Sequence, residues 1–200
     1  MSELSYSVVV NLINSTLNFF QFLNTKLEDF ILNFLRMKSS LEKVLEYKNE
    51  DIINRFVKMI DISEEEAEIV FLETKKWLWL CAQAKEDRLL KSDKVPKRIV
   101  IDNSLIIIDE MWHNFICFTK CYYDFCNDNF GDIIHHFPTP KKFNDSLKLK
   151  INDDVDFQRN RREKQYSYIY DLLGSETLTL WYETFADKYT PEFILKNRLK

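Results

Sequence analysis

The three histidines of the chain, His113, His135 and His136, fall within one short window. Asp109 precedes His113 by four residues, so a helix would place the two side chains on neighbouring turns of one face. Imidazole and carboxylate groups bind zinc and iron, and imidazole also transfers protons near neutral pH. The window is therefore a candidate polar site, although Asp109 and His113 also fit an ordinary surface pair.

One helix from residue 103 to 130 is expected to carry His113. Its apolar side chains recur around most of the circumference, which is typical of a buried, central helix. A single polar stripe remains, with Asp109, His113, Lys120 and Asp124. This stripe is either the one solvated face of the helix or the wall of a polar site. In either case Trp112 is expected to pack inside the protein.

The segment after Gly131 carries the other two histidines. Gly131 is predicted to end the helix in a left-handed conformation. Adjacent residues of an extended segment point to opposite sides, so one imidazole should face the core and the other solvent. His136 is the expected inward residue, with Trp112 or Tyr123 as its neighbour. On one straight helix, however, His113 lies about 25 Å from Gly131, so a shared site requires a nearly straight return of the chain.

The cysteines give a second set of candidate ligands, namely Cys81, Cys117, Cys121 and Cys126. Their helical spacing and the absence of a secretion signal favour reduced thiols in a cytoplasmic protein. On a regular helix Cys126 projects nearly opposite His113. The two side chains therefore cannot bind one ion unless the helix breaks.

The composition predicts an all-α fold, because two glycines and four prolines are too few for a turn-rich sheet protein. We expect a single domain over residues 1–200, built as a bundle of about six to seven helices around helix 103–130. Residues 1–38 would form a peripheral N-terminal helix, and residues 40–60 a second helix. A long loop is expected at 132–156.

Several helix ends can be predicted from local signals. Ser63 and Glu66 form a capping box that starts a helix running to about Leu90. A later helix should run from about Val155 to Leu173 and end at Gly174. Pro191 should open the last helical piece.

The distribution of charge indicates which classes of binding partner to expect. The net charge is −4 at pH 7, and the dense basic run at 159–164 lies beside acidic residues, so it fits a solvated helix face. No nucleic-acid partner is therefore expected.

Polar residues interrupt the apolar stretch 8–35 too often for a membrane-spanning helix. Lying on a membrane surface is a minor alternative for this stretch, weakened by its lack of a basic face. The oligomeric state is left open.

The segment "IDEMWHNFICFTKCYYDFCNDNFGDIIHHFP" resembles the core of the glycine-rich domain-containing protein-like family. That family's core has an acid, Trp-His, a Tyr, a Cys, a Gly and a final His. The matching residues in this chain are Asp109, Trp112, His113, Tyr122 or Tyr123, Cys126, Gly131 and His135 or His136. The resemblance implies a common helical core in which these residues belong together. It implies no established reaction.

Two functions stay open at this point. One is an interaction or regulatory role with a protein partner, in which Trp112, Tyr123 and Cys126 pack the core. The alternative is a small metal-dependent enzyme that holds Zn or Fe with His113 and His135 or His136. No nucleophile–base pair, phosphate-binding loop or dinucleotide fingerprint points to another reaction.

Overall fold

The computed structural model describes residues 14–27, 39–137 and 155–199. By their internal contacts the residues form two units, 1–38 and 39–200, and each is described by itself. The described residues are mostly helical and contain no strand, and the one backbone bridge among them joins Ile60 to Arg198. The prediction of an all-α fold is confirmed.

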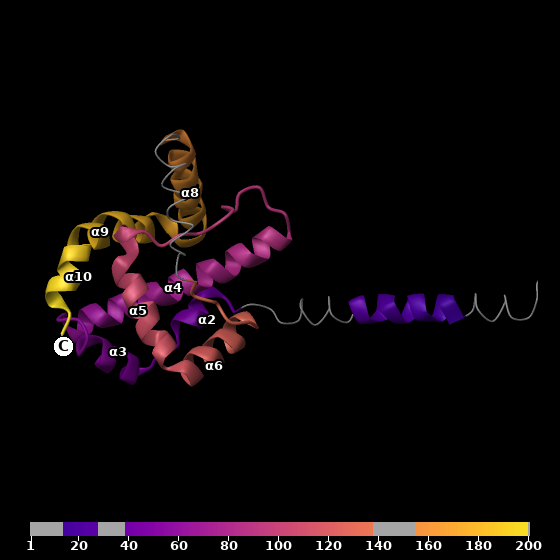
Figure 1. Ribbon diagram of the computed structural model, residues 1–200, viewed down its shortest axis with the longest axis horizontal. Helices are drawn as coiled ribbons and strands as arrows, with labels where there is room; N and C mark the ends of the chain where they lie inside the picture. The colour runs from indigo at the N-terminus through magenta and orange to yellow at the C-terminus, as the bar shows by residue number, and fades with distance from the viewer. Residues whose placement is uncertain (1–13, 28–38, 138–154, 200) are drawn as a thin grey trace, which may run out of the picture. The chain divides into compact units, whose positions relative to one another are not determined.

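The larger unit is a bundle of helices and short helical turns (Figure 1). In chain order they are α2 (Leu41–Leu45), α3 (Glu50–Val57), α4 (Glu64–Leu89), η1 (Asn103–Leu105), α5 (Ile106–Cys117), α6 (Thr119–Phe130), α8 (Val155–Thr179), η2 (Leu180–Thr184), α9 (Phe185–Lys188) and α10 (Pro191–Asn197).

The core lies between α4 and the helices packed on it. The short helices α2 and α3 pack against α4, and α5 crosses both α4 and α3 (Figure 1). Phe115 is fully buried at the centre of an aromatic cluster, with ring centroids 5.3 Å from both Phe71 and Phe125. Trp112 is also buried, as the sequence predicted, and so is Tyr122.

The predicted helix 40–60 is wrong, because the chain leaves the helical conformation between α2 and α3. Asn49 caps the new helix, since its side chain accepts hydrogen bonds from the backbone N–H groups of Asp51 and Ile52. Lys75 of α4 binds the other side of the break. Its Nζ donates to the carbonyls of Leu45 and Tyr47, both at 2.7 Å. These donors and acceptors replace the helical hydrogen bonds that the break removes.

The predicted single helix 103–130 is also wrong, because Phe118 separates α5 from α6. Phe118 has φ −84° and ψ 61°, which lies outside the helical region. No glycine or proline marks this position. The break lets α6 fold back along the core, where Tyr122 lies edge-on to Phe115 at 5.1 Å. Aromatic packing between the two helices therefore outweighs the local helical preference.

Most of the predicted helix ends agree with the structure. Ser63 and Glu66 form both hydrogen bonds of the capping box at the start of α4. Gly131 ends α6 with φ 70° and ψ 1°, the left-handed conformation. Gly174, by contrast, has φ 82° and ψ 170° and produces a kink inside α8 rather than a left-handed end. Pro191 opens α10, and α8 begins at Val155. Residues 138–154 of the predicted loop lie outside the described residues.

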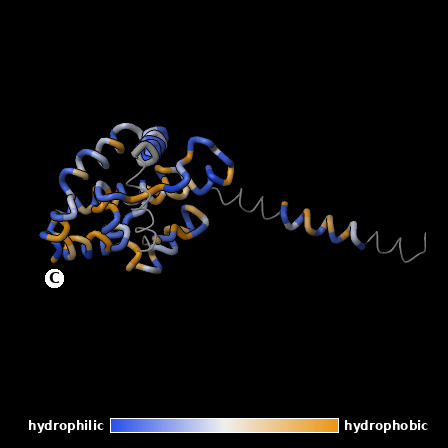
Figure 2. The backbone as a smooth tube through the Cα atoms, turned by 45° about the horizontal axis from the view of Figure 1, so that its top comes forward, coloured by the Kyte–Doolittle hydropathy of each residue, from blue (hydrophilic) through white to orange (hydrophobic). Residues whose placement is uncertain are grey.

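The smaller unit is described as one helix over residues 14–27. Apolar and polar residues alternate along it in Figure 2, and its large apolar side chains are 44–59% exposed. Within the described residues no helix has both the length and the apolar composition to cross a membrane.

Candidate functional site

The turn at Phe118 brings His136 back to α5. Because α6 reverses direction, the segment after Gly131 returns to α5 over a short distance (Figure 1). The His136 ring then lies on Trp112 with centroids 4.4 Å apart, and against His113 at 4.3 Å. The obstacle seen in the sequence, a long straight helix between the histidines, is therefore absent.

Asp109 lies between the two imidazoles. Its Oδ1 is 2.8 Å from Nε2 of His136, and its Oδ2 is 3.6 Å from Nδ1 of His113. One ligand atom from each of the three side chains lies within 4.8 Å of the others. We call this set the Asp109–His113–His136 cluster. The predicted contact between Asp109 and His113 is confirmed.

The cluster is open to solvent on one side. The His113 side chain is 50% exposed, Asp109 27% and His136 17%. A bound ion would therefore have protein ligands on one side and free positions on the other. Such an arrangement resembles catalytic metal sites more than closed structural ones.

Tyr122 holds the returning segment in place. Its hydroxyl accepts a hydrogen bond from Nε1 of Trp112 at 2.9 Å and donates to the carbonyl of Ile134. Burial raises the pKa of Tyr122, so the hydroxyl stays protonated and able to donate. Ile134 is two residues before His136. Tyr122 thus ties the loop to the Trp112 side of α5.

Cys126 belongs to this supporting layer and not to the cluster. It is fully buried, and its sulfur contacts the backbone of Ile134 and the Tyr122 hydroxyl. Burial raises the pKa of the Cys126 thiol, which disfavours the thiolate that a metal needs. The structure therefore gives Cys126 a packing position.

The two remaining candidate residues lie at the surface. Tyr123 is 54% exposed, so the packing position expected for it is wrong and belongs to Tyr122. Adjacent side chains on a helix point about 100° apart, so Tyr122 enters the core while Tyr123 faces solvent. His135 is exposed, with its ring 5.7 Å from Phe137. The predicted division between an inward His136 and an outward His135 is confirmed.

The three donors of the cluster can hold a transition-metal ion. Two imidazoles and one carboxylate form the ligand set of non-haem iron enzymes, and zinc accepts the same groups. Ligand atoms around such an ion are separated by roughly 3 Å, so the side chains need only small movements. An ion would take the place of the hydrogen bond between Asp109 and His136.

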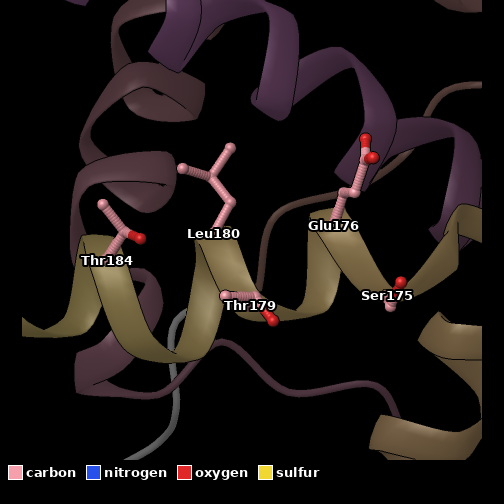
Figure 3. A pocket seen from close by; sticks show the side chains of 5 residues that line it. All are labelled: Ser175, Glu176, Thr179, Leu180 and Thr184. Carbon is pink, nitrogen blue, oxygen red and sulfur yellow. The ribbon is translucent and has the colours of Figure 1, made fainter.

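A shallow pocket on α8 and η2 offers different chemistry. It is lined by Ser175, Glu176, Thr179, Leu180 and Thr184, which all come from one helical stretch (Figure 3). None of these residues belongs to the cluster. Three hydroxyls and one carboxylate on an open surface define no ligand, so this pocket carries no functional assignment.

Comparison with known proteins corrects the resemblance drawn from the sequence. The model of the UCP032817-like family matches residues 41–160, and its description names no reaction or ligand. This match overturns the resemblance to the glycine-rich domain-containing family. No curated protein and no solved structure matches the chain. The matched range covers more than half of the chain and includes Asp109, His113 and His136. The chain belongs to the UCP032817-like family.

Proposed function

We propose that the protein binds one divalent transition-metal ion, Zn²⁺ or Fe²⁺, through Asp109, His113 and His136. The observation that carries this proposal is the approach of three ligand atoms to within 4.8 Å, although His136 lies 27 residues after Asp109. Two segments that are distant in the sequence thus supply a carboxylate and two imidazoles to one exposed place on the protein surface.

The exposure of the cluster favours a reactive ion over a structural one. His113 is half exposed, so water or a small ligand can occupy the remaining positions. A bound ion of this kind polarises an oxygen atom or activates a water molecule. The protein would then act as a small metal-dependent enzyme.

Titration of the metal-free, untagged protein with Zn²⁺, and with Fe²⁺ under anaerobic conditions, tests the proposal. We expect one ion per chain. Asp109→Asn, His113→Ala and His136→Ala should each weaken binding by about a hundredfold or more, because each removes one of three ligands. His135→Ala is the matched control, since His135 is adjacent in the chain but outside the cluster. Equal binding by the His135 and His136 variants would contradict the proposed site.

An interaction role remains a second proposal, supported by helix 14–27. Six large apolar side chains of this helix are exposed: Leu17, Phe19, Phe20, Phe22, Leu23 and Leu27. Contiguous apolar surface of this kind is typical of a protein–protein contact. Sedimentation velocity of the full chain and of Phe19→Ser/Phe22→Ser tests self-association. Two monomers with the same sedimentation coefficient would contradict a second copy of the chain as the partner.

A cytoplasmic location forms part of the same proposal. Its support is that Cys81, Cys117, Cys121 and Cys126 are all free thiols. Free thiols are typical of reducing compartments. Trapping of the thiols with a mass-tagged maleimide in intact cells would test this, and disulfide-linked cysteines in that experiment would contradict it.

A further inference from the structure

The end of α4 presents two leucines to solvent. Leu89 is 76% and Leu90 80% exposed, among the most exposed large apolar side chains of the described residues. Their backbone is nevertheless well held. The N–H of Ser92 donates to the carbonyl of Asp87 at 2.9 Å, and that of Lys91 to Arg88 at 3.1 Å. This pair of bonds is the Schellman motif, so the leucines project from an ordered helix end.

Lys91 occupies a position that normally favours glycine. It has φ 56°, and it is the one residue other than glycine with positive φ in the described part of the chain. The left-handed conformation is unfavourable for a residue with a Cβ atom. The Schellman motif accounts for this conformation, because its residue after the cap is left-handed. Here that side chain places a positive charge directly after the two leucines.

Further cations surround this helix end. Lys94 and Lys97 follow in the loop and are exposed, and Asp93 is the one acid between Lys91 and Lys97. The loop is held to α4, because Nε of Arg88 donates to the carbonyl of Pro96 at 3.1 Å. The lysines therefore stay close to the leucines.

The far end of this loop lies against α8, which carries further basic side chains. Gln165 forms two hydrogen bonds with the backbone of Val100, at 2.9 and 3.0 Å, which fix the end of the loop beside α8. Arg161 lies one turn before Gln165 on the same face, and Arg162 and Lys164 are exposed next to it. Glu163 offsets one charge and is paired with Arg159.

We propose that this surface binds a membrane that contains anionic lipids. Leu89 and Leu90 would enter the boundary between headgroups and acyl chains, and the lysines and arginines would contact the lipid phosphates and carboxylates. A lipid surface accounts for the leucines, which a nucleic acid does not. Single-stranded nucleic acids need aromatic rings for stacking, and residues 88–98 contain none.

Co-sedimentation of the full chain with phospholipid vesicles tests this surface. We expect binding to phosphatidylcholine vesicles that contain about one third phosphatidylserine. Binding should be much weaker without phosphatidylserine or at high salt. Leu89→Ser/Leu90→Ser and Lys94→Glu/Lys97→Glu should each weaken binding by about tenfold or more.

Two matched controls separate this surface from the rest of the protein. Leu195 is 79% exposed and Lys43 is exposed, both away from the end of α4. Leu195→Ser and Lys43→Glu should therefore bind like the unchanged protein. Lys91→Gly should raise the melting temperature, because it relieves the left-handed conformation. The same variant should weaken vesicle binding.

The outcomes that would overturn the proposal are specific. The proposal fails if the protein does not bind the anionic vesicles. It also fails if the leucine and lysine variants bind as tightly as the controls, since helix 14–27 would then be responsible. Binding of a single-stranded RNA oligonucleotide in place of vesicles would assign the basic surface to nucleic acid instead.

Discussion

Two polar clusters of the larger unit differ in how fully the protein satisfies them. Glu73 of α4 is 2% exposed, and its two oxygens accept from Nε1 of Trp181 at 2.7 Å and from Nζ of Lys76 at 2.8 Å. Asp109 of α5 is partly exposed, and its second oxygen is 3.6 Å from His113. The Glu73 cluster is complete without a ligand, whereas the Asp109 cluster has capacity left for one.

The comparison separates two roles that look alike in a sequence. A buried carboxylate with matched donors fixes the packing of the elements that supply them, here α4 and η2. A partly exposed carboxylate between two imidazoles contributes little to packing and can exchange its partners. We therefore expect substitutions in the first cluster to change stability and substitutions in the second to change ligand binding.

The largest stability effect is expected for Glu73→Leu. This change leaves the buried Nε1 of Trp181 without an acceptor and removes the ion pair with Lys76, so unfolding should become easier by about 3 kcal/mol. Urea denaturation measures it. Glu68→Leu is the matched control, because Glu68 is exposed on the same helix.

The same experiment applied to Asp109 completes the comparison. Asp109→Asn should change the free energy of unfolding by less than about 1 kcal/mol. If Asp109→Asn lowered the free energy of unfolding as much as Glu73→Leu, the open cluster would also stabilise the fold. That result would contradict the proposed difference between the two clusters.

Lys75 gives the second prediction, through pH. Burial lowers the pKa of Lys75 to about 8 from a usual value of 10.5. Between these values the unfolded chain binds more protons than the folded protein, so the contribution of Lys75 to stability increases with pH. The contribution is fully present above about pH 10.5 and is lost as the pH falls through 8.

Lys75→Met isolates this effect from other titrating groups. The variant loses the two hydrogen bonds to the carbonyls of Leu45 and Tyr47 and should be less stable throughout. The difference in unfolding free energy between the unchanged protein and the variant should widen from pH 8 to pH 10. A difference that stays constant or narrows would contradict the lowered pKa.

The sequence was a good guide to local signals and a poor guide to tertiary breaks. The Ser63–Glu66 capping box and Gly131 were correctly interpreted, because each acts through its own backbone neighbours. The break at Phe118 has no local cause, because the aromatic packing of α6 on Phe115 produces it. Helical periodicity continues through such a break and therefore could not reveal it.

The candidate site depended on that missed break. Asp109, His113 and His136 were all recognised by residue type and spacing, but on a straight helix their common site required a nearly straight return of the chain. Tyr122 was assigned no supporting role, since its partner Ile134 becomes a neighbour only after the chain turns at Phe118. The one available signal was the pair Tyr122–Tyr123, for which the motif left both residues open while the packing role was assigned to Tyr123.

Tyr122→Phe should have a smaller effect, and it tests whether the residues that support the Asp109–His113–His136 cluster affect both stability and metal binding. The change removes the hydroxyl that accepts from Trp112 and donates to Ile134, at an expected loss of about 1–2 kcal/mol in stability. With the loop less firmly held, the affinity for Zn²⁺ should fall about tenfold, as is typical when a group that orients a ligand is lost. Tyr123→Phe is the matched control, because Tyr123 is exposed. Unchanged zinc affinity in Tyr122→Phe would remove Tyr122 from the support of the site.

Alkylation of the cysteines gives the smallest perturbation, because it leaves the sequence unchanged. Burial raises the pKa of Cys81 to about 12, so at pH 8 its thiolate population is about a thousandfold below that of a thiol with the usual pKa of 9. The pKa of the buried Cys126 is raised as well. With iodoacetamide at pH 8, Cys117 should therefore react first, since it is exposed, and Cys81 and Cys126 last. In urea all four thiols should react at similar rates.

An ion held by Asp109, His113 and His136 should leave the reaction of Cys117 unchanged. Protection of Cys117 by Zn²⁺ would instead make that thiol a fourth ligand, one turn after His113, and would extend the open cluster along α5.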